Sequence, residues 1–165
     1  AISGDTTKGL KNRINTNLEE INSDSNTTIV LHIGFNDSII EKEGNRISKQ
    51  STRENLEQII NVSKEHAKNV VLIGFTPVDE HRTDPLPNEP ECSFKNAQVK
   101  KYEKIAVEVA EKKSVKFIPL FERFNSEDWR ENLWDGVHPN TEGHRKIFEE
   151  VKPRIFEEID FDLSN

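Results

Sequence analysis

Two short apolar runs, separated by a stretch long enough for a helix, restrict the fold of this chain more than any other feature. The runs TTIVLHIG (27–34) and NVVLIGF (69–75) are rich in β-branched residues, which is typical of strands covered on both faces. A third run of this kind, VKFIP, occupies 115–119. The sequence therefore predicts at least three buried strands.

Helical periodicity fills the stretches around these runs and predicts helices over 7–21, 51–67, 94–112 and 141–158. Thr6 or Thr7 would cap the first helix, and Ser51 with Glu54 is in capping-box register for the second. Pro153 would bend the last helix. Residues 76–93 contain four prolines among charged residues, so we expect a long irregular loop there.

Strands that alternate with helices predict a parallel sheet with helices on both faces, in a single domain over 1–165. In such sheets functional groups gather outside the carboxyl ends of the strands. The segment GFND (34–37) follows the first run directly, and WDGVHPN (134–140) lies between the third run and the last helix. We expect both segments, with the 76–93 loop, on one rim of the sheet.

Charge and cysteine content exclude several kinds of partner. The net charge is −7, and a nucleic-acid interface would need a concentrated basic face. A small, uncharged substrate fits this balance better. The single cysteine, Cys92, excludes an internal disulfide and a cysteine zinc cluster. No apolar run reaches the length of a membrane span, and no signal-peptide pattern is visible, so we expect a soluble chain whose compartment stays open.

Three short motifs, in order along the chain, resemble the conserved blocks of the SGNH hydrolases, the GDSL-like lipases and esterases. Gly34–Asp37 resembles their Gly-x-Asn-Asp block, and Asp135–His138 resembles their Asp-x-x-His block. The start, ISGDTTKGL (2–10), resembles the block with the oxyanion glycine, here Gly4. The resemblance implies a three-layer α/β/α, flavodoxin-like fold and ester hydrolysis through an acyl-enzyme, without metal or cofactor.

The chemistry of ester hydrolysis fits these residue types. The resemblance implies that His138 is the general base and that Asp135 holds its tautomer. The backbone N–H of Gly4 and the amide of Asn36 would form the oxyanion hole, since fixed donors stabilise negative charge on a carbonyl oxygen. The substrate would be a small carboxylic ester: a short lipid ester, a thioester or an acetylated sugar.

Each motif also has a purely structural interpretation. An Asn-Asp pair after a strand is commonly a turn, and Asp135 and His138 would then be polar loop residues before a helix capped by Asn140 or Thr141. The occurrence of all the motifs together favours the catalytic interpretation. Among the other histidines, we expect His32 in the core, His66 at a helix end, His81 in the proline-rich loop and His144 on the last helix.

The nucleophilic serine of the resembled family has no convincing counterpart. Thr6 in Gly4-Asp5-Thr6 lacks a preceding strand, and Ser38 falls in the oxyanion block. We therefore expect roughly 35 or more residues upstream, carrying the first strand-helix-strand unit, or else a second copy or partner segment that completes the sheet. Without the serine, turnover should fall on the order of a millionfold.

Two other functions stay open at this point. One is a catalytically inactive relative that only binds its ligand. The other is a metal-dependent phosphoesterase with Asp37, Asp135, His138 and His144 as ligands, although such sites need more carboxylates and histidines than this chain offers. Trp129 and Trp134, with Phe121 and Phe124, would either line an acyl pocket or belong to the core.

Overall fold

The structure is a computed structural model and describes residues 2–20 and 27–157. Within these residues, the central sheet has three parallel strands: β1 (Thr28–Leu31), β4 (Asn69–Ile73) and β5 (Lys116–Ile118). Their order is β1-β4-β5, with Val30 paired to Val71 and Leu72 to Phe117. This confirms the predicted parallel sheet.

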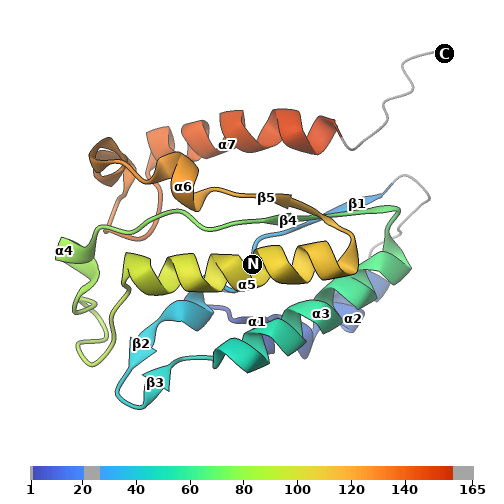
Figure 1. Cartoon of the computed structure of the whole chain (residues 1–165), viewed down its shortest axis with the longest axis horizontal. Coiled ribbons are helices and arrows are strands. Elements are labelled where there is room, and N and C mark those ends of the chain that lie inside the picture. The colour runs from blue at the N-terminus through green and yellow to red at the C-terminus, as the bar shows by residue number, and fades with distance from the viewer. Residues whose placement is uncertain (1, 21–26, 158–165) are drawn as a thin grey trace.

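Helices cover both faces of the sheet, as Figure 1 shows. The helices α1 (Thr7–Lys11), α2 (Ile14–Glu19), α3 (Lys49–His66) and α5 (Asn96–Lys113) lie on one side, and α7 (Thr141–Phe156) lies on the other. Leu72 of β4 is fully buried in the larger core, whereas its neighbour Val71 is fully buried under α7. The α/β/α layering predicted from the sequence is therefore confirmed, and β4 is apolar on both faces because both are covered.

The helix boundaries differ from the predicted ones where side chains make tertiary contacts. The helix expected over 7–21 is divided into α1 and α2, because Arg13 leaves the helical conformation, with φ −128° and ψ −4°. Helix α3 begins earlier than expected, and Ser48 caps it by accepting from the Ser51 N–H at 3.1 Å. The predicted capping box of Ser51 and Glu54 is wrong. The expected helix ends at 21 and 158 lie outside the described residues.

Several short elements were not predicted, and they build the rim. After β1 come η1 (Asn36–Ser38) and a hairpin of β2 (Ile40–Glu41) with β3 (Gly44–Asn45). The loop expected over 76–93 contains a helical turn, α4 (Glu80–Thr83), so it is only partly irregular. Between β5 and α7 lie α6 (Phe121–Phe124) and η2 (Glu127–Asn132).

Strand β1 forms one edge of the described sheet. Leu31 is buried on the face towards α3, but Val30 is 43% exposed on the face towards α7. Its register partner Val71 is fully buried, so the cover over this face stops short of β1. His32 is exposed on this edge, and its expected place in the core is wrong for that reason. Among the described residues, no helix has the length and apolar character needed to cross a membrane.

Candidate active site

The loop before α7 brings Asp135 and His138 into direct contact. Oδ1 of Asp135 accepts the backbone N–H groups of Val137 at 2.9 Å and His138 at 2.8 Å, and Oδ2 lies 2.7 Å from Nδ1 of the His138 ring. Gly136 has φ +92°, which suits glycine and allows the chain to turn back within three residues. One carboxylate thus fixes both the loop and the imidazole.

The charge on Asp135 is stabilised by the same contacts. Partial burial would raise its pKa, but hydrogen bonds from the His138 backbone and ring and from the Val137 N–H lower the pKa to about 2. With Asp135 ionised beside Nδ1, the neutral ring carries its proton on Nδ1 and leaves Nε2 as the acceptor. That tautomer is the one a general base requires.

Helix α4 and its N-cap residue, Asp79, are hydrogen-bonded to the backbone of this loop. Nη2 of Arg82 donates to the carbonyl of Trp134 at 2.7 Å, and the Asp79 N–H donates to the carbonyl of Gly136 at 2.9 Å. A Cβ on Gly136 would lie 2.8 Å from the Cβ of Arg82. The role of Arg82 was not predictable from the sequence, because the carbonyl groups that it binds lie 51 and 52 residues further along the chain.

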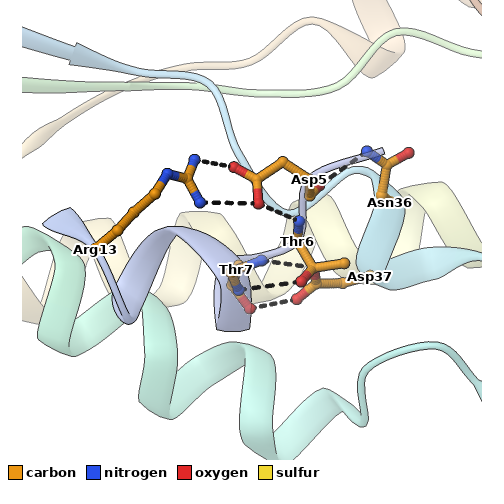
Figure 2. A network of polar contacts seen from close by, with 7 residues as sticks. Asp5, Thr6, Thr7, Arg13, Asn36 and Asp37 are labelled. Carbon is orange, nitrogen blue, oxygen red and sulfur yellow. Dashed lines mark hydrogen bonds and ion pairs between the residues drawn. The ribbon is translucent and has the colours of Figure 1, made fainter. Parts of the chain in front are cut away.

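The segment 4–7 approaches the end of β1, where it meets η1 (Figure 2). Gly4 has φ +68° and open space where a Cβ would project. Nδ2 of Asn36 donates one hydrogen bond to the carbonyl of Asp5 at 2.8 Å, and an amide nitrogen has a second proton to donate. Asp5 itself forms an ion pair with Arg13 at the start of α2. The Asn36 amide thus binds the segment that carries Gly4 through the carbonyl of the next residue, Asp5.

Asp37, the residue after Asn36, faces the interior instead. Its side chain is fully buried and accepts the Thr7 N–H at 2.9 Å, the Thr7 hydroxyl at 2.5 Å and the Thr52 hydroxyl at 2.6 Å. Nδ2 of Asn55 donates to Oγ1 of Thr7 at 3.0 Å. Burial raises the pKa of Asp37, although these hydrogen bonds oppose the rise. Asp37 therefore anchors the 4–7 segment to α3.

Two hollows meet at Asn36, Val137 and His138. The first, which we call the edge hollow, has about 210 Å³ and lies beside β1, where His32, Gly34 and Ile147 line it. The second, the hairpin hollow, has about 370 Å³ and is lined by Gly4 and Asp135 at one end and by Arg46 and Glu89 at the other. The structure thus brings all four predicted site residues to the lining of a single hollow.

The two hydroxyl side chains considered as nucleophiles are both engaged elsewhere. Oγ1 of Thr6 caps α1 by accepting the Gly9 N–H at 3.2 Å. Ser38 is fully buried, and its hydroxyl donates to the carbonyl of Phe35 at 2.7 Å. Within the described part of the chain, the hydrogen-bonding partner of the His138 ring is Asp135.

The other three histidines and the two tryptophans considered in the sequence lie outside the lining of both hollows. His66 ends α3, and His144 is exposed on α7. The backbone N–H of His81 is capped by Asp79 at 3.2 Å, and its side chain lines neither hollow. Trp129 belongs to the core and donates to the carbonyl of Pro77 at 3.0 Å, whereas Trp134 is 76% exposed.

The four residues considered as metal ligands are not brought together. Asp37 is sealed in the interior, and His144 is on the outer surface of α7. In the ranges that the structure describes, no group of three or more histidine, cysteine, aspartate or glutamate side chains is arranged to hold a metal ion.

The fold agrees with comparisons to known proteins. Residues 1–146 match the model of the GDSL-like lipase/acylhydrolase family. Because the match extends over most of the sequence, the chain belongs to this family of hydrolases.

Individual relatives give the same result. A GDSL esterase/lipase of Arabidopsis thaliana is 26% identical over 153 residues, which is 85% of this chain and 63% of that protein. The chain thus spans less than two thirds of this relative's length. The crystal structure of a lipase/acylhydrolase from Enterococcus faecalis is 26% identical, with a TM-score of 0.66 over 92% of this chain and 71% of that one.

An acetylxylan esterase from Geobacillus stearothermophilus, crystallised as a catalytic mutant, is 20% identical, with a TM-score of 0.64 over 91% of this chain and 69% of that one. At this level of identity the match shows a shared fold.

Proposed function

We propose that this chain provides the base and the oxyanion hole of a serine esterase that hydrolyses a small carboxylic ester through an acyl-enzyme. The observation that carries the proposal is the common hollow in which the Asp135–His138 pair meets Gly4 and Asn36. Catalytic mutants of the Geobacillus acetylxylan esterase replace a serine in one case and an aspartate in another, which is consistent with a serine nucleophile and an Asp–His pair here.

In the first step, a serine hydroxyl oxygen attacks the ester carbonyl carbon while Nε2 of His138 takes its proton. The N–H of Gly4 and the free amide proton of Asn36 stabilise the oxyanion. When the oxyanion collapses, the bond to the alcohol breaks and His138 returns the proton to that leaving group. Water then attacks the acyl-enzyme by the same route and releases the acid.

We infer that the nucleophilic serine lies on a segment that pairs with the exposed edge of β1, and that it reaches His138 from the side of the edge hollow. This hollow adjoins His138 and the exposed side of β1, where Val30 and His32 are uncovered. An uncovered apolar strand edge favours pairing with another strand. A segment that pairs there would bring its end to the rim, beside Asn36.

The test is hydrolysis of aryl esters of graded chain length by the full-length protein that contains these residues. His138→Ala should lower kcat about a hundredfold to ten-thousandfold, as expected for loss of a general base. Asn36→Ala should lower kcat about a hundredfold to a thousandfold. His81→Ala is the matched control, because His81 lines neither hollow. Equal rates for His138→Ala and the unmodified protein would remove His138 from the mechanism.

A second experiment locates the nucleophile. Labelling with a fluorophosphonate, followed by peptide mapping, should mark a serine other than Ser38 and should leave Thr6 unmarked. A label on either residue would contradict the proposed route of entry. If no residue is labelled and no ester is hydrolysed, the chain is a ligand-binding relative without hydrolytic activity.

A further inference from the structure

The hairpin hollow has a far wall made by two segments that are distant in sequence. Ile40 of β2 and Ser93 exchange backbone hydrogen bonds of 2.8 and 3.0 Å, which attaches the β2–β3 hairpin to the 86–93 segment. Leu86, Pro87 and Asn88 line the hollow from this segment. The wall is therefore a defined surface that faces Gly4, Asn36 and His138 across the hollow.

One cation of this wall is already neutralised. Nε of Arg46 donates to Oε1 of Glu41 at 2.6 Å, and its Nη2 pairs with Oε2 of Glu89. The Arg46 side chain is 21% exposed, whereas Glu89 is 51% exposed. One guanidinium shared by two carboxylates gives this group of three side chains a net charge of about −1, with Arg46 and Glu89 in the lining of the hollow and Glu41 just outside it.

The rest of the lining adds no free positive charge. Asp135 and His138 pair with each other, and the apolar part of the lining comes from Ile39, Leu86, Phe94 and Val137. An ester carrying a carboxylate would meet net negative charge and apolar surface, without a cation to pair with. Burying an unpaired charge in such a place is unfavourable.

We propose that the hairpin hollow binds an uncharged part of the ester, and that Glu89, by holding Arg46, excludes esters with an anionic group at this position. The volume of about 370 Å³ lies at the lower end for ligand pockets. It suits a short acyl chain or a single sugar unit better than a long fatty chain. This inference rests on the proposed esterase function.

The test compares kcat/KM for esters that differ by one charge. In the first pair, para-nitrophenyl hexanoate is neutral and para-nitrophenyl monoadipate carries a carboxylate on the acyl chain. In the second pair, the acetyl esters of para-hydroxybenzamide and para-hydroxybenzoate place the charge on the alcohol. The quantity measured is the ratio of kcat/KM for the anionic ester to that for the neutral ester. If the variants below change this ratio in the first pair, the acyl half of the ester occupies the hollow; if they change it in the second pair, the alcohol half does.

Glu89→Gln should raise this ratio about tenfold, because it removes one negative charge from the wall and leaves Arg46 paired with Glu41 alone, so that an anionic group no longer meets net negative charge there. Arg46→Gln should lower the ratio, since it leaves Glu41 and Glu89 unpaired. Glu91→Gln is the matched control: it changes the net charge of the chain equally, but Glu91 is exposed and lies outside the lining of the hollow. The ratio should not change in this control.

The outcomes separate this inference from the proposed function. If the full-length protein hydrolyses the neutral esters in a His138-dependent way, but Glu89→Gln and Glu91→Gln give the same ratios for both ester pairs, then Glu89 does not determine specificity and the inference is wrong. If no His138-dependent hydrolysis of any ester is found, the proposed function itself fails, and the inference fails with it.

Discussion

Asp37→Ala removes the acceptor that anchors the 4–7 segment, which carries the proposed oxyanion donor Gly4, to the core. The variant deprives three donors of their partner: the Thr7 N–H, the Thr7 hydroxyl and the Thr52 hydroxyl. The side chain that is lost is fully buried, so water does not replace it without opening the structure. We expect both lower stability and a misplaced Gly4.

The size of the effect follows from these contacts. Hydrogen bonds to a charged group contribute about 1.5–3 kcal/mol each, but burial raises the pKa of Asp37, so desolvation of the carboxylate offsets part of that sum. The two hydroxyls can also turn towards other acceptors, whereas the Thr7 N–H cannot. We expect a net loss of about 3 kcal/mol, which corresponds to a Tm about 6–12 °C lower for a domain of this length.

Urea unfolding followed by circular dichroism measures this loss as a lower midpoint with an unchanged m-value. Asp128→Ala is the control, because Asp128 is exposed and the change there should stay within about 0.5 kcal/mol. In the full-length protein, Asp37→Ala should also lower kcat more than it raises KM, because the proposed oxyanion donors would act mainly in the transition state.

The isosteric variant Asp37→Asn adds a pH test. Because the folded-state pKa of Asp37 is raised, its contribution is fully present below its unfolded pKa, near 3.8, and decreases as the pH rises through the folded-state value. Asp37→Asn should lack this dependence. Equal unfolding midpoints for Asp37→Ala and Asp128→Ala would refute the role of Asp37 as an anchor.

Two further predictions concern the Asp135–His138 loop. Gly136→Ala should cost about 1–2 kcal/mol more than Gly44→Ala in urea unfolding and should lower kcat, since both positions have positive φ but only at Gly136 would a Cβ meet another residue, Arg82. The pKa of Asp135 is lowered to about 2, so its stabilising contribution is present above pH 4 and is lost as the pH falls through 2. Asp135→Asn should therefore be less stable than the unmodified protein at neutral pH, by about 1 kcal/mol or less because the side chain is 43% exposed, and this difference should vanish in acid.

The sequence predicted the order of the larger elements because their periodicity reflects how they pack. Leu72 and Val71 lie in a run that is apolar at every position, and both faces of β4 are indeed covered. The β2–β3 hairpin escaped prediction because each strand has two residues, too few for a periodic signal. Its position depends on pairing with Ser93, which lies far along the chain.

The site was predictable where its contacts are local. Asp135 and His138 are three residues apart, so their spacing alone suggests the contact. The anchors behind the site are not local: Thr7 and Asp37 are 30 residues apart, and Arg82 lies 52 residues from the carbonyl that it binds. Such pairs become visible only when the folded chain brings the segments together.

Asn36 and Asp37 are joined by one peptide bond, yet the first faces the hollows and the second is sealed against α3. The wall of the hairpin hollow, by contrast, is attached to its neighbours through the Ile40–Ser93 pairing and the Arg46–Glu89 ion pair near the surface. Grafting a different hairpin or a longer 86–92 segment onto this scaffold should therefore alter which molecules enter while leaving the donor geometry intact, so selectivity and reactivity can be engineered as separate traits.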